Sequence, residues 1–125
     1  MGIGHTRRFK VLFRKLQIMD ILKLKDMIGG WFVGDFKPTA YQTKDFEVSY
    51  KLHPKGEVWD KHYHKVATEI NYLVRGEMIL SGTSLKEGDI FILHPEEIAD
   101  PEFLTDCEIV CVKTSSVKGD KYIVE

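Results

Sequence analysis

Two histidines and one glutamate stand close together near the middle of the sequence, in a spacing that can bind a metal ion. His62 and His64 are two residues apart, and Glu69 follows five residues later. In a β-strand, residues two apart point to the same face, so both imidazoles would enter one space. The odd offset turns Glu69 to the other face unless the chain bends, and we expect that bend at residues 65–68. Two imidazoles and a carboxylate that converge on one point are typical ligands of iron, zinc or manganese.

Two glycines flank this set and complete a longer pattern. Gly56 stands before the histidine pair and Gly76 after the glutamate, so the stretch reads G-x5-HxH-x4-E-x6-G. This pattern resembles the first signature motif of the cupin superfamily at every marked position. The resemblance implies a double-stranded β-helix, which is a jelly-roll barrel, with His62, His64 and Glu69 as ligands of a divalent iron, manganese or zinc ion. The alternative is that they are polar surface residues of an exposed strand.

The second cupin motif, G-x5-PxG-x2-H-x3-N, is matched only in part. Gly88 begins it, but the later glycine and asparagine are missing. A strict count from Gly88 puts Ala99 in the place of the motif histidine, whereas one inserted residue puts Asp100 there. Three arrangements are open: Asp100 is the fourth metal ligand, His94 is, or the three residues of the first motif bind alone. Asp100 is equally consistent with a turn residue before Pro101.

Short apolar stretches alternate with turn residues along most of the chain. We expect strands over residues 31–33, 46–52, 57–64, 69–75, 78–80, 90–93, 107–113 and 122–124. Residues 20–27 are ambiguous between a helical turn and an edge strand, and residues 95–101 are predicted to form an irregular acidic loop. Short strands without a central helix indicate an all-β sandwich or barrel. We assign residues 19–125 to one cupin-type domain and residues 1–18 to a short basic N-terminal extension.

The composition is that of a soluble globular domain. The chain has 125 residues, of which 43% are hydrophobic and 30% are charged, and its net charge is −1. The charge is uneven, since residues 1–30 hold seven lysines and arginines against two aspartates, and residues 31–125 hold eleven against seventeen acidic residues. The basic extension is either an amphipathic arm, a frayed terminus, or a stretch upstream of a natural start at Met19. We expect neither a nucleic-acid nor a membrane partner.

The two cysteines indicate the compartment. Cys107 and Cys111 are four residues apart in a predicted strand, which separates them by roughly 13 Å, too far for a disulfide. Buried thiols of this kind are typical of a reducing compartment. The N-terminus has no uninterrupted apolar stretch followed by a small-residue cleavage site. We therefore expect a cytoplasmic protein.

The resemblance leaves the activity open. Cupins include dioxygenases, isomerases, epimerases and decarboxylases, as well as modules that only bind a ligand. The chain is therefore either a metal-dependent enzyme, an isomerase, epimerase or dioxygenase acting on a carbohydrate or organic acid, or a non-catalytic ligand-binding or sensing module. Tyr50, Trp59 and Asn71 lie on predicted strands near the first motif and are candidate substrate-binding residues, although packing is the commoner use of each taken singly.

Apolar residues on both faces of one predicted strand indicate self-association. Residues 70–74, INYLV, place large apolar side chains on both alternate faces, more than a sheet with one solvated face requires. We therefore expect a homodimer, with the N-terminal segment crossing to the partner.

Overall fold

The computed structural model describes residues 18–125, so the predicted N-terminal extension lies outside the described residues apart from Ile18. One short 3₁₀ turn precedes an otherwise all-β chain. The elements are η1 (Leu24–Asp26), β1 (Trp31–Val33), β2 (Phe46–His53), β3 (His62–Tyr63), β4 (Thr68–Arg75), β5 (Glu77–Leu80), β6 (Thr83–Lys86), β7 (Ile90–Leu93), β8 (Pro101–Phe103), β9 (Cys107–Thr114) and β10 (Tyr122–Ile123). The all-β prediction is therefore confirmed.

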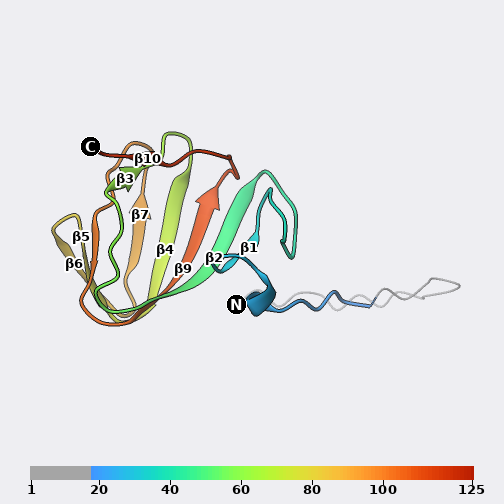
Figure 1. Ribbon diagram of the computed structural model, residues 1–125, viewed down its shortest axis with the longest axis horizontal. Helices are drawn as coiled ribbons and strands as arrows, with labels where there is room; N and C mark the ends of the chain where they lie inside the picture. Colours follow the sequence, from blue (N-terminus) through green and yellow to red (C-terminus); the bar gives the residue numbers. More distant parts are fainter. Residues whose placement is uncertain (1–17) are drawn as a thin grey trace, which may run out of the picture.

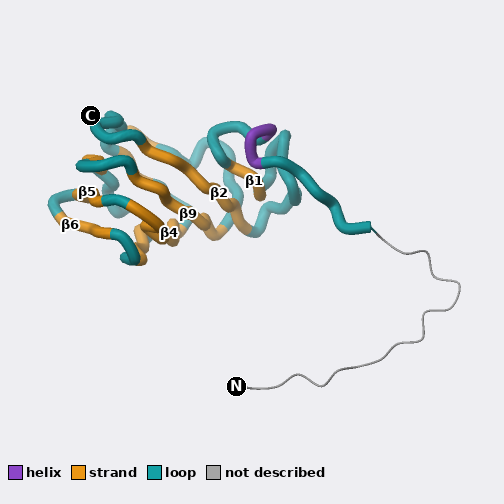
Figure 2. The backbone as a smooth tube through the Cα atoms, turned by 90° about the horizontal axis from the view of Figure 1, so that it is seen from below, coloured by secondary structure: helices purple, strands orange, loops and turns teal. Residues whose placement is uncertain are grey.

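The strands form three antiparallel sheets. The largest has five strands in the order β1-β2-β9-β4-β7, which lie side by side in Figure 1. A three-stranded sheet has the order β6-β5-β8, and β10 pairs with β3. Because β9 lies between β2 and β4, strands far apart in sequence are neighbours in space. In Figure 2, residues 18–23 leave the sheets as an extended segment that precedes η1.

A hydrophobic core joins the five-stranded and three-stranded sheets. Leu73, Cys107 and Ile109 come from β4 and β9, and they pack with Met78 of β5 and Phe103 of β8. Burial of each large apolar side chain contributes about 1.5–3 kcal/mol. The inward residues of β4 and β9 alternate along each strand, so the same face continues past the core into a cavity. The core therefore holds together the two sheets whose inner faces line the functional site.

Gly76 makes the crossover from the large sheet to the smaller one possible. It has a φ of 105° at the junction of β4 and β5. A Cβ atom at this position would lie 2.4 Å from the carbonyl oxygen of Asp106 and 2.8 Å from Sγ of Cys107. Since any side chain would clash there and the backbone is in a region that favours glycine, the second glycine of the motif has a structural role.

The main differences between the observed and the predicted elements are at four places. The strand predicted over residues 57–64 is reduced to β3, because residues 54–57 form a turn closed by a 3.0 Å bond from the Glu57 N–H to the Pro54 carbonyl. Strands β6 and β8 were not predicted, since neither has clear apolar alternation. The ambiguous residues 20–27 contain η1 instead of an edge strand.

The cysteine prediction is confirmed. Cys107 and Cys111 are both buried and both are free thiols. The cytoplasmic location that we inferred from them stays a prediction. None of the helical structure found in residues 18–125 has the length and apolar character needed to cross a membrane.

Candidate metal centre

His62 and His64 enter the same cavity from β3 and the residue that follows it. Only 7% of each residue is exposed, and the ring centroids are 5.5 Å apart. The short strand β3 is held on both sides, by β10 and by a bridge between His62 and Ala99. That bridge consists of backbone hydrogen bonds of 3.0 and 2.7 Å. The spacing of two residues therefore has the predicted effect, because both imidazoles lie on one face.

Backbone carbonyls determine which nitrogen of each imidazole is available. Nδ1 of His62 lies 2.9 Å from the carbonyl oxygen of Asp60. Nδ1 of His64 contacts the carbonyl oxygen of Asp120. A carbonyl only accepts, so each Nδ1 carries a proton, and in the neutral form of the ring Nε2 has the free lone pair. Burial lowers the pKa of His62, against the opposing effect of its bond to Asp60, so this ring is neutral at pH 7. Such outer hydrogen bonds are typical of histidines that bind metals.

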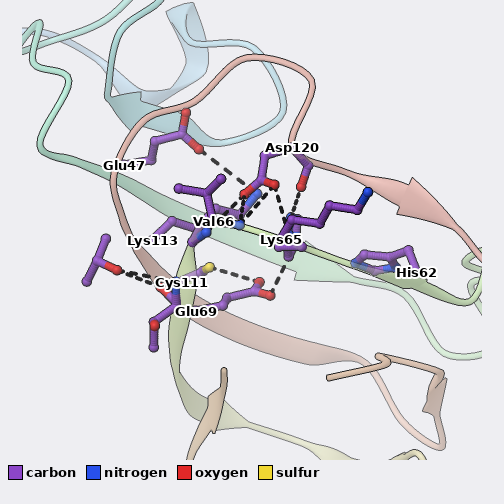
Figure 3. A network of polar contacts seen from close by, with 12 residues as sticks. Glu47, His62, Lys65, Val66, Glu69, Cys111, Lys113 and Asp120 are labelled. Atoms are coloured by element: carbon purple, nitrogen blue, oxygen red, sulfur yellow. Dashed lines mark hydrogen bonds and ion pairs between the residues drawn. The ribbon is translucent and has the colours of Figure 1, made fainter. Parts of the chain in front are cut away.

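The bend that turns Glu69 toward the histidines is built around one carboxylate. The backbone N–H groups of Lys65, Val66 and Ala67 donate to the Asp120 side chain over 2.9–3.2 Å, as Figure 3 shows in part. Burial by itself would raise the pKa of the Asp120 carboxyl. The hydrogen bonds from Ala67, Lys65 and Val66 outweigh that effect and hold its pKa below the usual range. The sequence predicted a bend here, but Asp120, more than fifty residues later, was not anticipated.

Glu69 lies between His64 and a thiol. Its Oε2 is 3.7 Å from Nε2 of His64, and its Oε1 accepts a hydrogen bond from Sγ of Cys111 at 3.1 Å. Figure 3 shows the Cys111 sulfur directed at this carboxylate. Burial, reinforced by the Glu69 charge, raises the pKa of the Cys111 thiol far above its usual value. The thiol therefore stays protonated and orients the carboxylate.

These three residues fit a divalent metal by donor type. Two imidazoles whose Nε2 atoms are not engaged by the backbone, together with one carboxylate, form a set that iron, manganese and zinc all accept. Within residues 18–125, no three His, Cys, Asp or Glu side chains already converge closely enough to hold an ion. The fit is therefore one of chemistry and orientation, and metal binding by His62, His64 and Glu69 stays a prediction.

The structure does not bring Asp100 or His94 to this set. The Asp100 side chain is 50% exposed, and its Oδ2 lies 3.8 Å from Nζ of Lys61. Ala99 lines the cavity instead. Neighbouring residues of extended chain point to opposite sides, so the backbone pairing of Ala99 with His62 directs Asp100 outward. His94 is exposed at a turn outside the cavity. The strict count from Gly88, which puts Ala99 in the histidine's place, is the register that the structure adopts.

The cavity has a volume of about 220 Å³ and is lined by residues of all three sheets. Of the candidate substrate-binding residues, Trp59 and Asn71 line it and Tyr50 does not. Ser49 and Lys51, the neighbours of Tyr50 on β2, do line the cavity, so strand alternation places Tyr50 on the outer face.

The chain has structural relatives but no match at the sequence level. No family model and no curated protein sequence matches it. An uncharacterized Klebsiella pneumoniae protein with a double-stranded β-helix domain is similar over 66% of this chain and 73% of its own, with 23% identity and a TM-score of 0.60. An RmlC-like cupin family protein from Methanocaldococcus jannaschii is similar over 59% and 73% of the two chains, with 23% identity and a TM-score of 0.51.

The chain has the cupin fold. The predicted jelly-roll architecture is thereby confirmed. The DMSP lyase DddQ from Ruegeria pomeroyi also shares it, over 74% of this chain and 48% of the lyase, with 13% identity and a TM-score of 0.60. Because identity is low throughout, these similarities establish the fold of the barrel and leave its chemistry to its own residues.

Three lysines also line the cupin cavity, namely Lys51 of β2, Lys113 of β9 and Lys121 next to β10. Burial, and next the charge of Lys113, lower the pKa of Lys51. Neither Lys113 nor Lys121 belongs to a motif that marks it as a site residue, whereas Lys51 lies on a predicted strand near the first motif. The alternation of side chains along a strand was the available signal. Lys51 and Lys113 each lie two residues from another cavity-lining residue on the same strand, so they point to the same face.

His53 comes directly before the turn residues 54–56, a position that predicts a surface residue, but the structure places it in the cavity wall. It is 7% exposed, lines the cavity and stacks on Phe103 with ring centroids 4.5 Å apart. Its Nδ1 lies 3.0 Å from Oε1 of Glu57, which also accepts a hydrogen bond from the indole of Trp59. The turn at residues 54–57 thus positions part of the cavity wall.

Proposed function

We propose that this chain is a metal-dependent cupin that acts on a small polar molecule, a carbohydrate or an organic acid. The observation that carries the proposal is the inward set of His62, His64 and Glu69, whose imidazoles have Nδ1 engaged by carbonyls and Nε2 available. A divalent iron, manganese or zinc ion held there would supply Lewis-acid activation of a substrate oxygen. The buried cavity wall around the set would orient the substrate and exclude water.

Ala99 supports a second candidate, a cupin module that binds its ligand without transforming it. It stands where the second motif has its histidine, and its methyl group cannot bind a metal. A three-residue set leaves more open positions, which suits the facial arrangement of non-haem iron enzymes. The absence of this histidine is equally consistent with a barrel that keeps its ligand-binding site and catalyses no reaction.

Metal content of protein purified without a polyhistidine tag tests the first proposal. We expect elemental analysis to find about one iron, manganese or zinc ion per chain. A protein that stays metal-free after incubation with each of these ions would contradict it. A turnover screen of the metal-loaded protein with carbohydrates and organic acids then separates the candidates, because only an enzyme consumes a substrate and loses that activity with a chelator.

We further propose that the protein is a homodimer that buries the outer face of the five-stranded sheet. Ile70 and Tyr72 of β4 lie opposite Ile92 and Ile90 of β7, and all four are exposed, by 37–68%. Next to them on β9, Val112 and Val110 extend the apolar surface. A continuous exposed apolar surface across three strands is typical of a protein–protein contact.

Light scattering in solution tests this assembly. We expect a dimer for the natural sequence and a monomer for Ile90→Glu, because a buried carboxylate opposes association. Val58→Glu is the matched control, since Val58 is 91% exposed in the loop before β3 and away from this face. A monomer at micromolar concentration for the natural sequence would contradict the proposal.

A further inference from the structure

Two tryptophans hold three lysine ammonium groups around the cavity. Nζ of Lys51 lies 4.8 Å from the ring centroid of Trp31 and 5.3 Å from that of Trp59. Lys113 lies 4.8 Å from the Trp31 ring, and Lys121 lies 4.8 Å from the Trp59 ring. Cation–π contacts of this kind stabilise each ammonium and fix its position over the ring. The three charges are therefore distributed over two rings and do not meet at one point.

The protein neutralises this charge only in part. Glu69 is the one carboxylate among the cavity-lining residues that the structure describes. Within residues 18–125, Lys51 and Lys121 make no ion pair, and Lys113 reaches Glu47 only at 4.0 Å. This excess is local, since residues 31–125 carry more acidic than basic side chains. A cluster of like charges in a partly buried site is unfavourable unless an anion binds there.

Two buried polar groups also face the cavity without a protein partner. In the described part of the chain, neither Oγ of Ser49 nor Nδ2 of Asn71 has a hydrogen-bond partner. Both residues line the cavity, and they are 0% and 3% exposed. They occupy one row of the sheet, because each lies opposite Cys111 of β9. A buried donor without an acceptor is unfavourable, so this row is suited to an oxygen-bearing ligand.

We propose that the cavity binds a small dicarboxylic acid that carries a hydroxyl or oxo group. The lysines hold its two carboxylates, and Ser49 and Asn71 hold its remaining oxygen. Two separated carboxylates match ammonium groups on different indoles better than a single compact phosphate does. A cavity of about 220 Å³ is smaller than a typical site for a drug-sized ligand and suits a molecule of this size. This inference rests on the proposed function only in placing the ligand in the same cavity.

Calorimetric titration of the chelator-treated, metal-free protein at low ionic strength tests the inference. The ligands are malate, succinate, glycerol 3-phosphate and the neutral polyol erythritol. Omitting the metal prevents chelation by malate and separates this test from the metal proposal. We expect malate to bind most tightly, succinate about threefold or more weaker, the phosphate weaker still, and erythritol not at all. Binding should weaken with added salt. Absence of dicarboxylate binding, or tighter binding of glycerol 3-phosphate, would overturn the inference.

Two double variants test which residues bind which part of the ligand. Lys51→Gln with Lys121→Gln should weaken both dicarboxylates by about tenfold or more, because each charge-assisted contact is lost. Lys61→Gln is the control, since that lysine pairs with Asp100 outside the cavity. Ser49→Ala with Asn71→Ala should abolish the preference for malate over succinate and leave succinate affinity unchanged. Unchanged affinity in the lysine variant, or an unchanged malate preference in the Ser49/Asn71 variant, would show that these residues do not form the site.

Discussion

Replacing both His62 and His64 with alanine is expected to lower metal affinity by at least about 100-fold, because it removes two of the three proposed ligands. Loss of a residue that merely orients a ligand already costs about 10- to 100-fold. Both side chains line an open cavity, so their truncation leaves no sealed void in the core. Competition titration with a chromophoric chelator measures the change, and circular dichroism verifies that the variant is folded.

Asp100→Ala is the matched control for the histidine variant. Its carboxylate is half exposed and pairs with Lys61, so its removal should leave metal affinity within about twofold. Stoichiometric metal in the folded double histidine variant would refute the proposed site. A loss of metal in Asp100→Ala as large as in the histidine variant would restore the ligand role that the sequence left open.

Replacing Asp120 with alanine is expected to destabilise the fold by about 2–4 kcal/mol, because three backbone N–H groups lose one shared acceptor. That is a large part of the 5–15 kcal/mol typical of a domain. The same change should also weaken metal binding, since the bend brings Glu69 to the histidines. Urea unfolding at pH 7 measures the stability.

The pH dependence of this effect follows from the lowered pKa of the Asp120 carboxyl in the folded state. The stabilisation is fully present above the unfolded pKa of about 3.9 and is lost as the pH falls through the folded value. The stability difference between the natural protein and Asp120→Ala should therefore narrow under strongly acidic conditions. Asp106→Ala is the control, because that exposed carboxylate accepts one backbone N–H, from Lys55. Equal effects of the two substitutions at pH 7 would contradict the assigned role.

The first motif was predictable from sequence because its geometry is local. Residues two apart on a strand share a face, so the common direction of His62 and His64 needed no tertiary information. The bend before Glu69 was predictable from the odd offset of five positions between His64 and Glu69. The turn at Gly76 was predictable because a glycine follows the next strand. The all-β class followed equally from short alternating stretches, since period and turn residues are properties of a few neighbouring residues.

The local sequence pattern could not decide which residue of the second motif faces the cavity. Whether Ala99 or Asp100 faces inward depends on how this segment pairs with His62, a residue more than thirty positions away. A shift of one residue in strand register exchanges the inward and outward side chains. The same reasoning applies to Tyr50. Its neighbours on β2, Ser49 and Lys51, face the cavity, so Tyr50 lies on the outer face of the strand.

The sequence by itself determined the fold class, the free cysteines and the common direction of His62 and His64, because each follows from patterns of spacing along the strands. Only the tertiary structure decided what surrounds these two histidines. Asp120 and the Ser49–Asn71 row are brought to the site by antiparallel pairing between distant strands or by long-range hydrogen bonds. The physical reason is that the buried side of a strand is selected by its partners across the barrel, and those partners are not neighbours in the sequence.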